Sequence, residues 1–278
     1  MISQKLRALR QQLLAGPYLI WVIGFIVLPV VVILYYALTN SSGALTTEHI
    51  LAIKDPVNRK ALLLSLKLAL IATAVCLVLS YPLAMILNGL KETHQGLIVF
   101  IFILPMWMNF MLRILAWKLL LSNNGVINTI LEKFGLGSVS ILNTPTAVVF
   151  CMVYDFLPFM ILPIYNSMAR ISRDILEAAQ DLGAGSITIF FKIILPLTFS
   201  GVLSGTIMVF VPALTSFAIS DIIGGGKVLL IGNVIEQAFM QEYNWYLGSG
   251  LSIVLMVFVI ASMALMRSKD TQQGGAIL

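Results

Sequence analysis

Charged residues are scarce in this chain. Its 278 residues include 17 Lys and Arg and 12 Asp and Glu, so 10% are charged while 59% are hydrophobic. Soluble domains are about one quarter charged, because such residues cover most of a folded surface in water. The shortage argues against a soluble enzyme, a disordered protein and a nucleic-acid-binding module. It leaves a protein that crosses a membrane several times.

Cysteine and histidine are also rare, with two of each. Cys76 and Cys151 both lie inside apolar runs, which argues against a disulfide framework or a zinc site. His49 and His94 have no partner at metal-ligand spacing, so we interpret both as surface residues. The sequence therefore predicts no metal site.

Long apolar runs are what the sequence has in abundance. A helix needs about 20 mostly apolar residues to cross the hydrocarbon core of a bilayer. One apolar run, residues 228–239, is too short to span the bilayer and contains Asn233 and Glu236, which favours an interfacial or re-entrant helix. The apolar run nearest the N-terminus, residues 17–38, is too long for the hydrophobic region of a signal peptide, so we expect it to be retained as a span. The prediction is an all-α membrane protein with one transmembrane domain over residues 1–278 and six spans, at 17–38, 61–87, 96–121, 144–168, 199–223 and 248–266.

Lys and Arg are distributed unequally between the two sides that these spans define. The side that holds both termini and the 169–197 loop has nine of them, including Lys5, Arg7 and Arg10, and the other side has five. Basic residues gather on the cytoplasmic side of membrane proteins. The bias therefore predicts a bacterial cell membrane protein with both termini in the cytoplasm. It also explains the net charge of +5 without a nucleic-acid partner.

The 169–197 loop, between the fourth and fifth spans, begins with the pattern of a short helix. Asp174 and Glu177 place carboxylates where a helix N-terminus has free N–H groups and a positive dipole end. Residues 175–182 are mostly good helix formers. Gly183 follows at the position where a helix often ends in a left-handed residue.

A second helix is predicted directly after this turn. Ser186 can cap its N-terminus, and Pro196 is expected to end it. Its apolar residues are spaced so that they share one face, namely Ile187, Phe190, Phe191 and Ile194. The loop is therefore predicted to form a helix–turn–helix on the cytoplasmic side.

The first helix of the loop has features of a docking surface. Ala178 and Ala179 are small and lie beside Glu177 and Asp181. Small side chains let another backbone approach closely, and flanking charges fix the register. The alternative is an ordinary amphipathic helix on the lipid surface. The residues alone leave both possibilities open.

The loop matches a longer pattern. Glu177-Ala178-Ala179 is followed by Leu182-Gly183 and by a Phe-rich stretch that closes with Ile193-Ile194-Leu195-Pro196. This pattern resembles the EAA loop of permease subunits of type I ABC importers, and it stands before the last two spans, as in that family. The resemblance implies the type I importer permease fold. It also implies that residues 177–183 enter a groove on a separate ATPase subunit.

Other stretches are similar to the B-type permeases of spermidine/putrescine importers. They are residues 107–113, 157–165, 220–226 and 230–235. Two departures touch the first stretch. That family often has Thr before the Asn and Tyr soon after the Arg, whereas this chain has Met108 and Leu115.

The resemblance implies a complex. Its members would be a second related permease, two ATPase subunits that bind ATP, and an extracytoplasmic substrate-binding protein. This chain would have no cofactor, no nucleotide site and no enzymatic activity of its own. Gly224-Gly225-Gly226-Lys227 does not match a phosphate-binding loop, because it lacks the earlier Gly and the Ser or Thr after Lys.

Asp155 is the carboxylate that the predicted spans bury most deeply. A charge at the centre of a bilayer costs on the order of 3 kcal/mol, so such a residue suggests a function. A polyamine is a thin apolar chain with ammonium groups, and a site for it needs carboxylates and aromatic faces. The candidate substrate-pathway residues are Asp155, Tyr154, Trp107, Asn109, Phe110 and, near the outer mouth, Asp221.

Arg113 in the third span offers Asp155 a different role. The two side chains could form a buried ion pair that stabilises helix packing and leaves cargo a nearly neutral path. Lys67 and Lys118 lie near span ends, where long side chains reach the interface. Arg113 and Lys118 could instead attract an anion, so an importer of another small solute remains an alternative. A membrane-embedded enzyme and a secondary transporter are less favoured.

Overall fold

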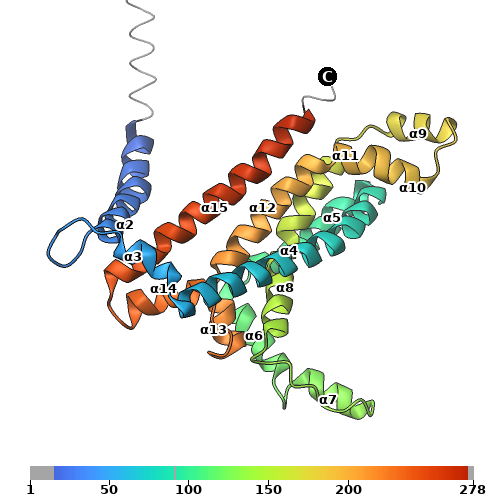
Figure 1. The fold of residues 1–278 in the computed structure, drawn as a ribbon. Coiled ribbons are helices and arrows are strands. Elements are labelled where there is room, and N and C mark those ends of the chain that lie inside the picture. The colour runs from blue at the N-terminus through green and yellow to red at the C-terminus, as the bar shows by residue number, and fades with distance from the viewer. Residues whose placement is uncertain (1–15, 91, 275–278) are drawn as a thin grey trace, which may run out of the picture. The chain divides into compact units, whose positions relative to one another are not determined.

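The computed structural model describes residues 16–90 and 92–274, with side chains at 16–90 and 96–266. Lys5, Arg7 and Arg10, which contribute to the predicted orientation, lie outside these residues, as does the side chain of His94. The regular elements of the described chain are helices, apart from one isolated β-bridge between Thr39 and Leu45 (Figure 1). The predicted all-α class is confirmed.

The described chain divides into two compact units. The smaller comprises residues 16–58 and 235–258, and the larger comprises 59–234 and 259–274. A continuous helix opens the smaller unit and contains η1 (Ile23–Val27) and α2 (Leu28–Leu38). The other helices of the smaller unit are α3 (Glu48–Leu51), η2 (Ala52–Lys54) and parts of α14 (Ile231–Met240) and α15 (Trp245–Gly274).

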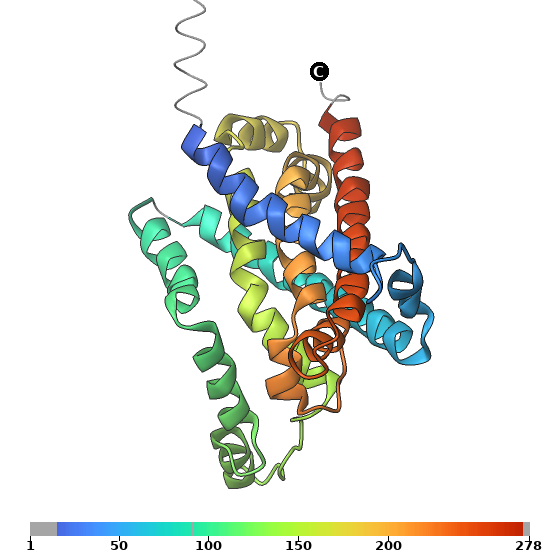
Figure 2. The ribbon, with the colours of Figure 1, turned by 90° about the vertical axis from the view of Figure 1, so that its left-hand side faces the viewer.

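The larger unit holds most of the remaining helices. In chain order they are α4 (Pro56–Gly89), α5 (Glu92–Ile103), η3 (Leu104–Trp107), α6 (Phe110–Leu121), α7 (Val126–Lys133), α8 (Pro145–Met168), α9 (Arg173–Asp181), α10 (Ser186–Ile189), η4 (Phe190–Ile194), α11 (Leu195–Leu197), α12 (Phe199–Thr215) and α13 (Ala218–Gly224). In both views α9 lies at one end of α8, and α7 lies at the opposite end (Figures 1 and 2).

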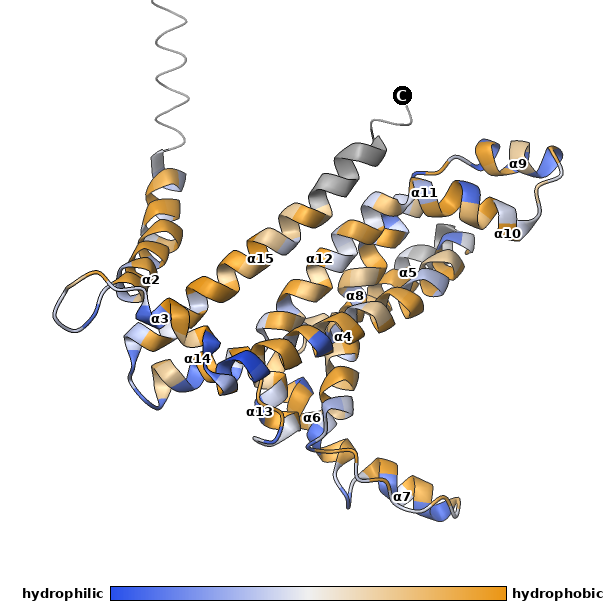
Figure 3. Ribbon diagram, viewed as in Figure 1, coloured by the Kyte–Doolittle hydropathy of each residue, from blue (hydrophilic) through white to orange (hydrophobic). Residues whose placement is uncertain are grey.

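Within the described residues, four helices are long and apolar enough to cross a membrane, and the number is six if each of two bent helix pairs counts as one span. The four are Gly16–Leu38, Pro56–Gly89, Pro145–Met168 and Trp245–Met266. Hydrophobic residues cover these helices over most of their described length (Figure 3). The six candidates overlap the six spans that the sequence predicts, but two of those spans are bent.

The third predicted span, 96–121, is broken rather than continuous. Its two halves, Gly96–Trp107 and Phe110–Lys133, meet at an angle of 91°. Pro105 has no N–H to continue the helix, and Met108 is extended, with ψ 147°. The Asn109 side chain then starts a new helix by accepting hydrogen bonds from Met111 N and Leu112 N, at 2.9 and 3.3 Å.

The fifth predicted span, 199–223, is also interrupted. α12 ends at Thr215 and α13 begins at Ala218. Before it, Ser186–Leu197 and Phe199–Thr215 meet at 64°. The expectation that Pro196 ends the second loop helix is wrong, because Pro196 lies in the first turn of α11, where a missing N–H is tolerated.

α14 corresponds to the short apolar run around Asn233. The N–H of Ile231 donates to Ser65 Oγ at 2.8 Å, which joins this helix to α4. Asn233 is buried, and its amide donates to Phe217 O and accepts from Leu230 N, both at 3.1 Å. Asn233 therefore fixes the start of the helix.

Aromatic side chains gather in the smaller unit and change the interpretation of His49. The His49 ring stacks on Tyr246 at 5.4 Å, and Tyr36 packs edge-on against Tyr246 at the same distance. His49 is half-buried, with Nε2 inaccessible to solvent. Its interpretation as a surface residue is wrong, because an isolated His in a sequence does not reveal a ring partner about 200 positions away.

α8 and α12 pack closely along the larger unit (Figures 1 and 2). Two glycines of α12 face α8. A Cβ on Gly201 would lie 2.6 Å from Pro163 O, and a Cβ on Gly205 would lie 2.7 Å from Met160 Sδ. Small residues let membrane helices approach this closely and gain dispersion contacts that lipid does not replace.

Gly205→Val should therefore force α12 away from α8. We expect a loss of about 1–3 kcal/mol of stability, the usual effect of overpacking. Ser204→Val is the matched control, since Ser204 is exposed on the same helix. Thermal unfolding of the purified protein in detergent measures both. Equal melting temperatures for the two variants would contradict the close packing.

Candidate functional site

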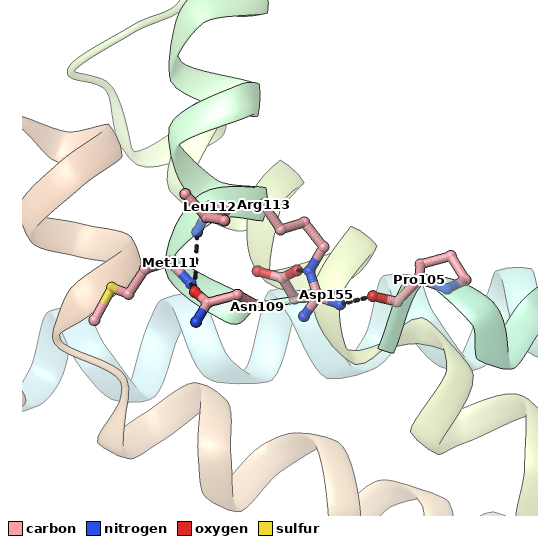
Figure 4. A network of polar contacts seen from close by, with 6 residues as sticks. All are labelled: Pro105, Asn109, Met111, Leu112, Arg113 and Asp155. Carbon is pink, nitrogen blue, oxygen red and sulfur yellow. Dashed lines mark hydrogen bonds and ion pairs between the residues drawn. The ribbon is translucent and has the colours of Figure 1, made fainter. Parts of the chain in front are cut away.

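A buried ion pair joins α6 to α8. Arg113 Nε contacts Asp155 Oδ1, and the Arg113 and Asp155 side chains are 10% and 1% exposed (Figure 4). The same guanidinium donates from Nη1 to Pro105 O at 2.6 Å. Arg113 therefore binds both the carboxylate and the carbonyl near the break in the third span. The pairing with Arg113, one of the two roles considered for Asp155, is present in the structure.

Aromatic rings surround the pair. The Arg113 guanidinium carbon lies 5.8 Å from the centroid of Phe110 and 5.9 Å from that of Tyr154, which is within cation–π range. Trp117 packs edge-on against Tyr154 at 5.0 Å and against Phe150 at 4.8 Å. The faces of these rings favour a cation, and their bodies exclude water from the pair.

The second carboxylate oxygen of Asp155, Oδ2, accepts no hydrogen bond within the described chain. Oδ2 is buried and has no hydrogen-bond partner among the residues that the structure describes. Oδ1 lies against Arg113 at ion-pair distance, but outside hydrogen-bond geometry. An unpaired buried acceptor is costly, which marks this oxygen as a place for a donor.

The other predicted pathway residues are placed differently. Asn109 shares the bend with Arg113, but its carbonyl oxygen already caps α6. Trp107 precedes the bend; its ring is 75% exposed and packs edge-on against Phe100 at 5.7 Å. Tyr154 and Phe110 lie over Arg113, as described above. The structure thus brings Asp155, Arg113, Phe110 and Tyr154 together and leaves Trp107 on the surface.

Asp221 stands apart from the ion pair. It lies in the first turn of α13 and is exposed, and its carboxylate makes no ion pair within the described chain. Its neighbour Ser220 is buried and donates to Val228 O. α13 packs against α6 and α8, so Asp221 belongs to the same helix cluster as the pair.

The 169–197 loop forms the predicted helix–turn–helix at one end of the larger unit (Figure 1). α9 ends at Asp181, and Gly183 is left-handed with φ 80°, as the sequence predicts. Ala184 N donates to Ala179 O at 3.0 Å and closes the turn. Ser172 precedes α9 but makes no side-chain cap.

The residues proposed for docking lie on the outside of this loop. Glu177, Ala178 and Asp181 are exposed, and Ala179 is half-buried. The Leu182 side chain is 88% exposed. A large apolar side chain left in water beside small residues and two carboxylates is typical of a surface that another protein covers.

The apolar face predicted for the second loop helix is split. Ile187 and Phe191 are exposed, whereas Ile189 is buried and Phe190 packs on Tyr81 at 5.3 Å. The expectation of one shared face is wrong because residues 190–194 form a π-helix, whose wider turn shifts the side chains that follow.

One contact at this loop has no clear signal in the sequence. The Tyr81 hydroxyl of α4 is hydrogen-bonded to Thr198 Oγ1 at the 64° bend. Both side chains are buried. The sequence shows only that Tyr81 precedes Pro82 inside an apolar run, and this does not indicate which residue its hydroxyl contacts.

The chain matches the family described as "Binding-protein-dependent transport system inner membrane component" over residues 12–268. A match over most of the chain shows membership, so this chain belongs to that family. It is a multi-pass membrane component of a transport system and not an enzyme. The predicted permease class is confirmed.

Curated relatives narrow the comparison. The spermidine/putrescine transport system permease protein PotB of Haemophilus influenzae is 37% identical over 247 residues, which is 86% of each chain. PotB of Escherichia coli (strain K12) is 38% identical over 245 residues, or 85% of this chain and 89% of that protein.

Solved structures show the same fold. A chain of a bacterial ABC transporter involved in the import of the acidic polysaccharide alginate superposes with a TM-score of 0.81 at 17% identity, covering 96% of this chain and 98% of that chain. The alginate transporter in complex with a periplasmic protein gives 0.81 at 14% identity. The predicted fold of an ABC importer permease is confirmed.

The ion pair makes a prediction about stability. Arg113→Met leaves a buried carboxylate uncompensated and frees Pro105 O, so we expect a loss of about 3–5 kcal/mol. Adding Asp155→Leu should recover most of it, because an apolar pair of similar volume needs no compensation. Thermal unfolding in detergent compares the three proteins. A single variant as stable as the original chain would show that the pair contributes nothing.

Proposed function

We propose that this chain is a permease subunit of an ATP-driven importer for polyamines such as spermidine and putrescine. The observation that supports it most is the 37–39% identity to PotB permeases over about 85% of the chain. The alginate transporters share the fold at 14–17% identity, which is too low to suggest a shared cargo.

The ion pair suggests how a cationic cargo would pass. Arg113 balances most of the charge of Asp155, so a polyamine would meet a nearly neutral site. An ammonium group of the cargo would donate to the free Oδ2 of Asp155, while Tyr154 would offer its ring face. Conduction needs a site that cargo can enter and also leave. A carboxylate whose charge Arg113 mostly balances meets both needs, whereas an unpaired carboxylate would hold the cargo too tightly.

The exposed loop around Glu177 would receive the movement of a partner ATPase subunit. We propose that residues 177–183 dock on a partner ATPase subunit, where Ala178 and Ala179 permit close backbone contact and Leu182 fills an apolar pocket. ATP would be bound by that partner, and this chain would need no cofactor. Motion of α9 would then move the membrane helices between two states of unequal cargo affinity.

The complex would contain a second related permease, two ATPase subunits and an extracytoplasmic binding protein that delivers cargo. The Glu177 loop and α7 lie at opposite ends of α8 (Figure 2). We propose that α9 lies on the cytoplasmic side and α7 on the outer side, and the distribution of Lys and Arg supports a cytoplasmic position for both termini.

Glu177→Lys should block docking. We expect at least a tenfold loss of ATPase association and of uptake, because the substitution reverses the charge of a residue proposed to contact the partner's groove. Glu132→Lys on α7 is the matched control, since it makes the same exchange at an exposed position at the opposite end of the larger unit. Co-purification from membranes measures association. Equal association of both variants would reject the docking assignment.

Vesicles that contain the complete complex should import labelled spermidine or putrescine when ATP is supplied. Asp155→Asn should raise half-saturation for the cargo at least threefold, because the Arg113 charge is then no longer balanced. Glu132→Gln, the same chemical change outside the site, should leave it unchanged. Uptake of an unrelated solute and no polyamine would remove the polyamine assignment, and an unaltered half-saturation would remove Asp155 from the cargo path.

A further inference from the structure

The connection between α9 and α12 contains an unusual element. Residues Phe190–Ile194 form the π-helix η4, and the 64° bend follows at Thr198. π-Helices are rare and recur at functional sites, because they insert an extra residue into a turn that can shift register. This segment is the direct connection along the chain from the Glu177 loop to α12.

A single residue of α4 contacts both ends of the segment. The Tyr81 ring packs edge-on against Phe190 at 5.3 Å, where η4 begins. The Tyr81 hydroxyl is hydrogen-bonded to Thr198 Oγ1, at the bend that follows η4. Tyr81 is 8% exposed and Thr198 is fully buried, so water does not compete for this bond.

The direction of the hydrogen bonds follows from the available protons. Thr198 Oγ1 has one proton and donates it to Ile194 O at 2.7 Å. Tyr81 must therefore be the donor to Thr198. The result is a chain from Tyr81 through Thr198 to the last carbonyl of η4, and such chains are strengthened in surroundings of low dielectric.

We infer that Tyr81 is a positioning residue that transmits motion of the Glu177 loop to α12. Tied to α4, residues 190–198 move as one piece and tilt α12 at the bend. Without the hydroxyl, the π-helix and the bend absorb the displacement instead. α12 packs on α8 through Gly201 and Gly205, so its movement reaches the helix that contains Asp155.

This inference rests on the proposed function for its transport readout. The expected result is specific: Tyr81→Phe keeps the ring contact with Phe190 but removes the hydroxyl. The number of ATP molecules hydrolysed per labelled spermidine imported should rise at least threefold. Thr198→Val should raise this ratio to the same extent, and the double variant with Tyr81→Phe should raise it no further. Thr198→Ser keeps the hydroxyl and should therefore keep the normal ratio.

Ser80→Ala is the matched control. Ser80 lies beside Tyr81 in α4, and its buried hydroxyl makes no hydrogen bond among the described residues. Removing it should leave the ratio unchanged. Equal ratios for Tyr81→Phe and Ser80→Ala would overturn the inference, since a merely structural hydroxyl lowers uptake and ATP hydrolysis together.

A second measurement needs no cargo. Amide hydrogen exchange of residues 190–198 in the assembled complex should be at least fivefold faster in Tyr81→Phe than in Ser80→Ala. Unchanged exchange would also overturn the inference. If the unsubstituted complex imports no polyamine, the proposed function fails, and this exchange comparison alone decides whether Tyr81 ties the segment.

Discussion

A helix that breaks in apolar surroundings must find partners for the backbone groups it frees, since no water is available there. Each major bend in the larger unit meets this requirement with a side chain from a few residues further along. Arg113 donates to Pro105 O at the bend in the third span, and Asn109 caps the helix that follows. Thr198 donates to Ile194 O at the bend before α12. The bends are therefore built into the sequence.

The same constraint explains the character of the proposed cargo site. Arg113 binds both the freed carbonyl of Pro105 and the Asp155 carboxylate. Removing the Arg113 charge would therefore also leave Pro105 O without a hydrogen-bond donor. Charge neutrality and helix geometry are linked at one residue. This accounts for a buried Arg in a chain with so few charges, and it makes the site a shared property of α6 and α8.

Composition and run length sufficed to predict the class and the approximate spans, because these depend on neighbours in sequence. Local residue spacing likewise predicted the first helix of the 169–197 loop and its turn at Gly183, but neither the end of the second helix nor its exposed face. The sequence suggested Arg113 as a possible partner of Asp155, because two opposite charges inside spans have few other options, but it left a cargo-binding role for Asp155 open as well. The 91° bend, the π-helix and the Tyr81–Thr198 bond were not predicted. The π-helix depends on a small change in helical pitch and the Tyr81–Thr198 bond on a contact between distant segments, and neither leaves a mark in hydropathy. The residues that make the 91° bend, Pro105, Asn109 and Arg113, lie inside a long apolar run that reads as one continuous span.

The close approach of α12 to α8 has a mechanical consequence. Where Gly201 and Gly205 leave no room between the helices, the two cannot slide independently and act as one rigid arm. α12 has 17 residues and is therefore about 25 Å long at 1.5 Å per residue. A tilt of about 10° at Thr198 would displace its far end by roughly 4–5 Å for a helix of this length. A small angular change at one end of α12 becomes, at its other end, a displacement comparable to the width of a polyamine chain.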